Sequence, residues 1–421
     1  MTVLADLRAL DHTQRHTVAA SFLGWTLDAF DYFLLVMVMP GVAKTFHVDV
    51  KEVAFALFLT LAFRPVGALV FGRLADRYGR RRILMIDVTL YSILGLACAF
   101  APSLAVLLVL RALFGIAMGG EWGTGASLAL ESIPTRSRGI VSGILQSGYP
   151  CGYLLCAIAY GLLFNSIGWR GMFALGVLPA LLVLYLRRSV PESPVFEQRE
   201  RAGMRRGVRE TMRGRWGLFG YLIVLMAVFN MFSHGSQDVY PTFLKLQEHF
   251  DTHVTSLLTI VLNLGALVGG LVFGQWSERI GRRRAMVIAA LLALPAIPLW
   301  SYGGSIVLLG VGAFWIQIAV QGAWGVVPIY LNELSPDDVR GTLPGVAYQL
   351  GNLIAAGTAY ILVWLAQTWG GDYALAQSIW IACVAVLLAI LTAFGPEARG
   401  VRFGVTKDPD AANMPGSPAS P

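Results

Sequence analysis

Long apolar stretches recur from one end of the chain to the other, and short polar segments separate them. Each stretch holds about twenty residues, the length that an α-helix needs to cross a hydrocarbon core about 30 Å thick. The pattern predicts an all-α membrane protein with twelve transmembrane helices. The predicted spans cover roughly residues 18–43, 53–75, 83–101, 104–130, 139–164, 169–187, 217–244, 254–276, 285–301, 305–331, 341–366 and 373–395.

The polar segments repeat. GRLADRYGRRR at 72–82 returns as GQWSERIGRRR at 274–284, 202 residues later, and the same offset relates ESIPTRSRG at 131–139 to ELSPDDVRG at 333–341. Two matches at one offset indicate a duplication of six spans. We therefore predict two six-helix bundles related by a pseudo-two-fold axis normal to the membrane, an arrangement that suits a transporter. The expected domains are residues 1–187 and 216–396, with a cytoplasmic linker at 188–215 and a disordered cytoplasmic tail at 397–421.

Charge composition and its distribution fit this interpretation. Only 14% of the residues are charged, whereas soluble proteins carry about a quarter. Most of the 32 Lys and Arg residues fall in alternate loops, which predicts cytoplasmic N- and C-termini in a plasma (inner) membrane. The net charge of +7 then reflects membrane topology, and nucleic acid is not an expected partner.

Charged residues inside the spans are the first candidates for function, because they are expensive in a membrane. Arg64 lies near the middle of the second span and Asp28 near the middle of the first. A permanent cation at this depth needs a carboxylate, which either the substrate or the protein supplies. We expect Arg64 to bind an anionic substrate and Asp28 to pair with it in the empty site; a fixed structural pair is the alternative.

The polar stretch FNMFSHGSQDVYPTF at 229–243 stands out within an apolar span. His234 and Asp238 are four residues apart and therefore share a helix face. Such a coupled pair can gain and lose a proton near neutral pH. The other polar residues are expected to line a cavity with this pair, and they are Asn230, Ser233, Ser236, Gln237 and Thr242.

The repeat separates scaffold residues from functional ones. Arg64, Arg111 and Glu121 correspond to alanines in the second half, whereas Asp28 and Asp31 correspond to Asn230 and Ser233. Glu121 could pass a proton to the cytoplasm, although a solvated or arginine-paired glutamate is also open. Gln146 and Tyr149 of the fifth span are secondary cavity candidates.

The repeated loop resembles the signature loop of the major facilitator superfamily, and RALFGIAMGG at 111–120 resembles that superfamily's motif in span four. The resemblance covers residues 18–395 and implies that Arg111 takes part in proton coupling. It also implies that the loop locks helices in the outward-facing state, although its arginines could serve topology alone. The implied gating residues are Gly72, Asp76, Arg77, Gly79, Arg80, Glu278 and Arg279.

Residues 230–242 are similar to the N-x-x-[ST]-H-x-[ST]-Q-D-x-x-x-T signature of lactate and pyruvate proton symporters within the sialate:proton symporter family. This resemblance implies that His234 and Asp238 couple transport to a proton and that Arg64 holds the carboxylate. The expected substrate-binding residues are Arg64, Asn230, Ser233, His234, Gln237, Thr242, Gln146 and Tyr149. The expected proton-coupling residues are Asp28, Asp31, Arg111, Glu121, His234 and Asp238.

The sequence thus predicts a monomeric, proton-coupled symporter of small monocarboxylates that works by alternating access. Its expected partners are the carboxylate, protons and the lipid bilayer. Aromatic acids or sialic acids are the nearest alternative substrates, and a sensor or a passive channel is a different class. No metal-ligand cluster, nucleophile triad or phosphate-binding loop follows from the sequence, so we expect no enzyme, cofactor or metal.

Overall fold

The computed structural model describes residues 10–48, 50–201 and 214–401, which form helices and no strands. Part of the predicted linker, 202–213, and the predicted tail from residue 402 lie outside the described residues. The first half contains α2 (His12–Phe46), α3 (Val50–Tyr78), α4 (Arg80–Ala99), α5 (Leu104–Met118), α6 (Glu121–Glu131), α7 (Arg138–Ala174), α8 (Pro179–Ser189) and α9 (Pro194–Arg201). The second half contains α11 (Trp216–Gln237), α12 (Tyr240–Leu246), α13 (Thr252–Ile280), α14 (Arg282–Leu292), α15 (Ile297–Tyr302), α16 (Ile306–Leu334), α17 (Leu343–Ala355), α18 (Thr358–Thr368) and α19 (Tyr373–Phe394).

Within the described ranges, ten helices are long and apolar enough to cross a membrane. The other two predicted spans are helical but interrupted. The sixth consists of the end of α7, beyond a kink at Gly168, and α8, while the eleventh consists of α17 and α18. The fourth span is also interrupted, because Gly119 and Gly120 separate α5 from α6. The predicted all-α membrane fold is confirmed, with breaks that the hydropathy pattern did not reveal.

Glycine produces the sharpest turns in the fold. A single residue, Gly79, separates α3 from α4, and its counterpart Gly281 separates α13 from α14. Their φ angles are +105° and +97°, values that glycine adopts without strain because it lacks a Cβ atom. A Cβ atom would also collide with Glu192 at the first position and with Glu397 at the second. The repeated loop therefore requires glycine at both places.

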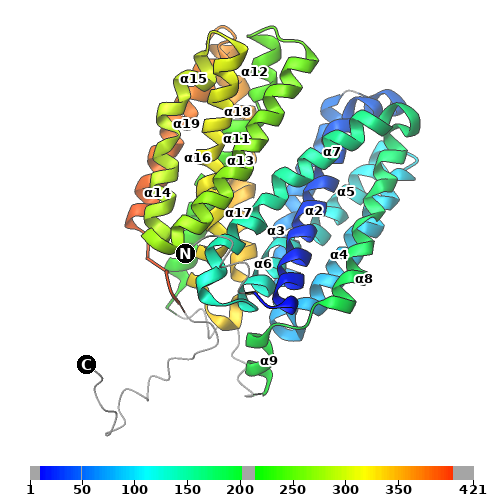
Figure 1. Ribbon diagram of the computed structural model, residues 1–421. Helices are drawn as coiled ribbons and strands as arrows, with labels where there is room; N and C mark the ends of the chain where they lie inside the picture. The colour runs from blue at the N-terminus through cyan, green and yellow to red at the C-terminus, as the bar shows by residue number, and fades with distance from the viewer. Residues whose placement is uncertain (1–9, 49, 202–213, 402–421) are drawn as a thin grey trace.

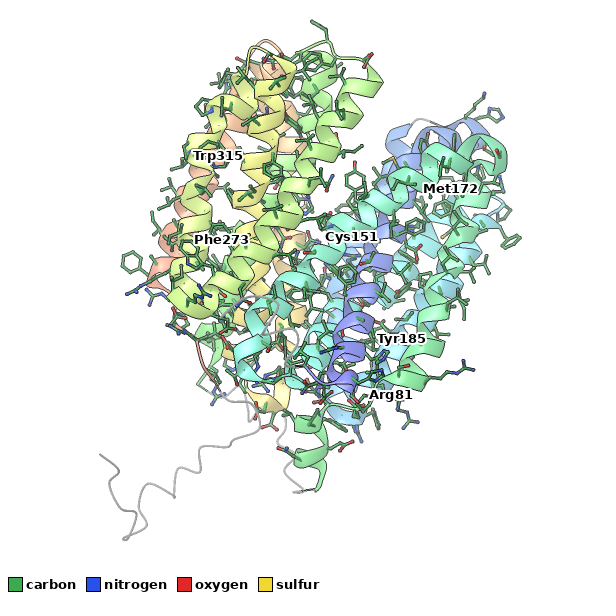
Figure 2. The ribbon with its side chains drawn as sticks, in the orientation of Figure 1. Arg81, Cys151, Met172, Tyr185, Phe273 and Trp315 are labelled. Carbon is green, nitrogen blue, oxygen red and sulfur yellow. The ribbon has the colours of Figure 1, made fainter. Side chains whose placement is uncertain are left out.

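The helices form two bundles (Figure 1). We call α2–α8 the N-terminal bundle, α11–α19 the C-terminal bundle, and the end where α2 begins and α19 ends the terminal face. Arg81 and Tyr185 lie toward this face and Met172 toward the opposite end (Figure 2). The bundles meet at the terminal face and diverge away from it, with α7 packed on α13 and α3 on α17. Small residues allow the close approach: a Cβ atom on Gly143 would lie 2.5 Å from the carbonyl oxygen of Gly270.

The duplication reappears as ion pairs at the terminal face. Arg80 lies 2.9 Å from Asp76 and 3.4 Å from Glu131. In the second half, Arg282 lies 2.9 Å from Glu278 and 3.0 Å from Glu333. Both arginines are fully buried, and the paired carboxylates balance their charge.

The acidic residue of each loop also binds the other bundle. Asp76 accepts hydrogen bonds from the backbone N–H of Gly341 at 2.9 Å and from the Thr342 hydroxyl at 2.5 Å. Glu278 accepts one from the backbone N–H of Gly139 at 2.6 Å. Gly139 and Gly341 are equivalent in the repeat, so the two halves hold each other with the same bond. These bonds close the molecule at the terminal face.

The remaining signature residues have different surroundings. Gly72 lies against the Thr342 backbone, where a Cβ atom would come within 2.8 Å of the Thr342 Cα atom. Arg77 is exposed, and its guanidinium lies 5.2 Å from the centre of the Tyr78 ring. The backbone carbonyl of Arg279 accepts a hydrogen bond from Arg399 at 3.0 Å.

We predict that Asp76→Ala and Glu278→Ala each favour opening at the terminal face. A hydrogen bond to a charged group contributes about 1.5–3 kcal/mol, which corresponds to a population change of about 10- to 100-fold. Double electron–electron resonance between spin labels at exposed Arg73 and Arg284 would measure the separation of the bundles. Arg77→Ala is the matched control and should leave the distance distribution unchanged. Unchanged distributions in both acidic-residue variants would refute the proposed lock.

Candidate functional site

A cavity of about 480 Å³ lies between the two bundles. Both bundles line it, as in transporters whose central site lies at the interface of two repeats. Cys151 on α7, two residues beyond cavity-lining Tyr149, lies between the bundles in Figure 2. The lining residues are Trp25, Asp28, Ala29 and Tyr32 of α2, Leu61 and Arg64 of α3, Gln146 and Tyr149 of α7, Asn230, Ser233 and His234 of α11, Gln321 and Trp324 of α16, and Tyr348 and Asn352 of α17.

Arg64 is the cation of the cavity. It is 4% exposed, and its Nη2 atom lies 3.1 and 3.2 Å from the two carboxylate oxygens of Asp28. Its guanidinium also lies 5.6 Å from the centre of the Tyr32 ring, which adds a cation–π contact. The Nε–H group is buried and, among the described residues, has no acceptor. The guanidinium therefore keeps donor capacity that a second carboxylate in the cavity could use.

His234 faces the cavity from the other bundle between two acceptors. Its Nδ1 atom lies 2.8 Å from Asp238 Oδ2, and its Nε2 atom lies 3.1 Å from Asn352 Oδ1. An Nε2–H group can donate to the Asn352 oxygen and an Nδ1–H group to the Asp238 carboxylate, and the ring carries both hydrogens only when it is protonated. The His234–Asp238 pair is therefore placed to bind a proton.

Aromatic rings cover the cavity on the side of the terminal face. Trp25 and Tyr348 lie one helical turn nearer that face than Asp28 and Asn352, respectively. The Trp25 ring lies 5.9 Å from that of Tyr149 and 6.3 Å from that of Tyr348. Trp324 lies 5.7 Å from Tyr348 and completes the layer. This aromatic layer separates the charged cavity from the closed end of the molecule.

Six of the eight predicted substrate-binding residues line the cavity. Arg64, Gln146, Tyr149, Asn230, Ser233 and His234 line the cavity. Gln237 does not line it and instead donates to Ser233 Oγ at 3.3 Å. Asp238 lies beside the cavity at the C-terminal end of α11, with its side chain 36% exposed. The side chain of Thr242 lies outside the described residues.

Three predicted proton-coupling residues lie away from the cavity, inside the N-terminal bundle. Arg111 donates from Nε to Thr60 Oγ1 at 3.2 Å and lies over the Phe114 ring. Asp31 faces Gly176, where a Cβ atom would come within 3.3 Å of its Oδ1 atom. Glu121 lies in a neighbouring hollow of about 210 Å³ that shares Trp25 with the cavity. Glu121 is 1% exposed, and neither of its carboxylate oxygens makes a hydrogen bond in the described part of the chain.

Sequence reasoning missed part of the lining. Gln321 and Trp324 of α16 and Trp25 of α2 received no role, although each contributes to the cavity. Gln321 carried the same signal as Asn230, since it is an amide inside an apolar span. The two tryptophans carried no distinguishing signal, because tryptophan is common in membrane helices.

Comparisons with known proteins identify the family and the fold. The sequence matches the Major Facilitator Superfamily over residues 21–353 and 230–412. It is 28% identical to the carboxylic acid transporter protein homolog of Saccharomyces cerevisiae, covering 92% of this chain and 67% of the yeast protein. It is also 28% identical to the sialic acid transporter NanX of Escherichia coli, covering 94% and 97% of the two chains. The fold matches that of the proton:xylose symporter XylE with a TM-score of 0.77 at 21% identity, over 93% of this chain and 98% of XylE.

We predict that Asp28→Asn destabilises the protein by about 3–5 kcal/mol, because it leaves the buried Arg64 charge uncompensated. Adding Arg64→Gln to that variant should recover most of the loss, since the unpaired charge is then removed. Asp238→Asn is the comparison, because the partly exposed His234–Asp238 pair should contribute less than about 1 kcal/mol. Chemical denaturation in detergent measures all three. Equal losses in Asp28→Asn and the double variant would contradict the charge argument.

Proposed function

The chain belongs to the major facilitator superfamily and is a multi-pass membrane transporter rather than an enzyme, and we propose that it is a proton symporter of small monocarboxylates such as lactate or pyruvate. One observation carries the proposal. A buried arginine with a spare N–H donor faces, across one cavity, a histidine–carboxylate pair that can bind a proton. An anion site and a proton site in one cavity suit the joint transport of an acid anion and H⁺.

Substrate binding follows from the Arg64–Asp28 pair. An incoming carboxylate competes with Asp28 for the guanidinium, whose planar fork binds carboxylates in a bidentate manner. Asp28 then becomes an unpaired buried carboxylate unless it takes up a proton. One anion and one proton entering together preserve the charge of the site. The loaded protein can therefore change its conformation without a large electrostatic barrier.

Other residues of the cavity would select the substrate and couple its transport to the proton. The amides of Gln146 and Asn230 can bind the hydroxyl or keto oxygen beside the carboxylate. His234 and Asp238 lie toward the open end and can take a proton from the water there. Proton transfer from this pair into the cavity would link substrate loading to the proton gradient.

Transport would then proceed by alternating access. The halves 1–187 and 216–396 rock about the cavity, which opens the terminal face when the Asp76 and Glu278 bonds break. The excess of basic residues in the loops of the terminal face supports a cytoplasmic location of that face at a plasma (inner) membrane. With that orientation, the closed terminal face corresponds to an outward-facing conformation. Both bundles that line the cavity belong to one chain, which supports a monomeric transporter.

A larger carboxylate is the second candidate, and the aromatic layer favours it. Trp25, Tyr149 and Tyr348 offer ring faces on which a planar or sugar-like substrate could stack. Benzoate-like acids and sialic acids therefore belong in the first substrate test.

We predict that purified protein in liposomes accumulates labelled lactate or pyruvate when an inward proton gradient is imposed. The test panel is lactate, pyruvate, acetate, benzoate and sialate, each with and without the gradient. Collapse of the gradient with a protonophore should abolish accumulation, and empty liposomes provide the background. Accumulation of benzoate or sialate with no response to lactate and pyruvate would replace the small-monocarboxylate proposal with the second candidate.

We predict that Arg64→Lys weakens carboxylate binding by about tenfold or more, because an ammonium group cannot reproduce the bidentate fork. Competition binding to the purified protein measures the dissociation constant. Arg77→Lys is the matched control, since Arg77 is exposed and lies 13 residues beyond Arg64 along α3. Unchanged affinity in Arg64→Lys would remove Arg64 as the anion site.

His234→Ala and Asp238→Asn should uncouple transport from the proton. We expect each variant to bind the carboxylate yet lose gradient-driven accumulation by about tenfold or more, because a proton-transfer group is missing. Uptake at several external pH values separates the loss of coupling from a loss of binding. Full accumulation in both variants would exclude the pair as the proton site.

A further inference from the structure

Three carboxyl groups in the structure are buried and have no hydrogen-bond partner on either oxygen, within the described residues. They are Asp31, Asp87 and Glu121, whose exposures are 2%, 0% and 1%. All three belong to the N-terminal bundle. Asp31 and Glu121 stood out in the sequence, whereas Asp87 of α4 did not. Asp87 has no role in the cavity or in the closed terminal face.

Asp87 lies against the break in the fourth span. A Cβ atom on Gly120 would lie 3.3 Å from Asp87 Oδ2, and Glu121 is the next residue along the chain. The titratable groups that act electrostatically on Asp87 are both acids, namely Glu121 of α6 and Asp28 of α2. No cation is among them in the described chain. A carboxyl group in such a place is stable only when it is neutral, so Asp87 holds a proton in this conformation.

The acids lie between the cavity and the terminal face. Gly120, the residue before Glu121, packs against Phe71 of α3 as well as against Asp87, so Glu121 and Asp87 lie at the same break in the bundle. Asp87 is seven residues along α4 from Arg80, about 10 Å at a helical rise of about 1.5 Å per residue. Arg80 belongs to the Asp76–Arg80–Glu131 ion pairs of the closed face. Asp87 therefore connects the surroundings of Glu121 with the part of α4 that leads to that face.

The internal repeat shows that packing does not require an acid at this place. Asp87 corresponds to Ala289, Glu121 to Ala323 and Tyr91 to Ala293, and all three alanines are fully buried. The same helices thus pack with methyl groups in the second half. A buried carboxyl group without a hydrogen-bond partner makes the folded state less stable than alanine would at the same position. Its presence in only one half points to a role other than packing.

Unpartnered hydroxyl groups lie in the same region. Ser21, Tyr91 and Thr124 are buried, and in the described structure their oxygens bond to nothing. Ser21 lines the hollow of Glu121, and Tyr91 is one turn from Asp87 on α4. Buried polar groups without protein partners are the usual sites of internal water. Hydroxyl groups and water could carry a proton between the two carboxyl groups.

We propose that Asp87 is a proton-carrying residue of the transport cycle, which receives the proton from Glu121 and releases it at the cytoplasmic face. This inference rests on the proposed proton-coupled function. When the terminal face opens, the Asp87 carboxyl loses its proton to cytoplasmic water. The Glu121 carboxyl then transfers its proton to the Asp87 carboxylate, and a proton from the Asp28 side of the cavity restores Glu121. One proton enters the series for each proton that leaves.

The test compares Asp87→Asn, which keeps the shape but cannot ionise, with Asp87→Glu as the conservative variant. Net proton-driven carboxylate uptake into liposomes should fall by about tenfold or more in Asp87→Asn and recover in Asp87→Glu. Carboxylate exchange at equal concentration and pH on both sides requires no net proton release. Exchange by Asp87→Asn should therefore stay within about twofold of wild type. Infrared spectra without substrate should show the C=O band of a protonated carboxylic acid that disappears in Asp87→Asn.

Several results would overturn the relay. Wild-type net uptake in Asp87→Asn would do so, as would a parallel loss of exchange and uptake, which indicates a structural role. An infrared spectrum with no missing carboxylic acid band would show that Asp87 does not hold the proton. Failure of the proposed function is separately visible, because wild-type protein would then accumulate no carboxylate under a proton gradient while its infrared bands still report on Asp87.

Discussion

A permanent positive charge in the middle of a membrane protein must be compensated, and Arg64 imposes this constraint on the whole structure. Its partner Asp28 balances the charge with two contacts from a single nitrogen, so the guanidinium retains a free donor. Because both groups are buried, any anion that approaches Arg64 changes the protonation that Asp28 can sustain. The ion pair thereby connects substrate binding with proton binding through electrostatics alone.

Buried arginines at the closed end of the molecule are also compensated by carboxylates. Arg80 and Arg282 are fully buried within triads whose two carboxylates come from the same half. Between the halves, Asp76 and Glu278 reach backbone N–H groups of the opposite bundle, and Arg340 lies 3.7 Å from Glu131. The shorter ion pairs of the two triads thus lie within one bundle, while hydrogen bonds and the longer Arg340–Glu131 contact join the bundles. Arg340 also pairs with Asp337 of its own half, so it keeps a carboxylate partner when the bundles separate.

Much of the site could be anticipated from single residues. The ionisable and amide residues of the spans identified Arg64, Asp28, Asn230, Ser233 and His234, which all line one cavity. The helix period placed His234 and Asp238 on one face, and they lie 2.8 Å apart. Asp87 carried the same signal as Arg64, since it is an ionisable residue inside a predicted span, but it was not among the predicted site residues. The contact between Asn352 and His234, across 118 positions of sequence, comes only from the tertiary structure.

The sequence by itself determined the all-α membrane class, the approximate spans and the duplication, because hydropathy and repeats are local or periodic properties. It also identified ionisable side chains inside the spans as candidates for function, because such side chains are costly in a membrane. Arg64 and Asp28 form the pair that was expected from their depth in the spans. Only the tertiary structure decided the other partnerships: Asp76 with Gly341, and Asp31, Asp87 and Glu121 with no partner in the described residues. The breaks at Gly119–Gly120 and after Ala355 were likewise beyond the sequence pattern. Partnership and interruption depend on how distant helices pack, and that packing is a property of the whole chain.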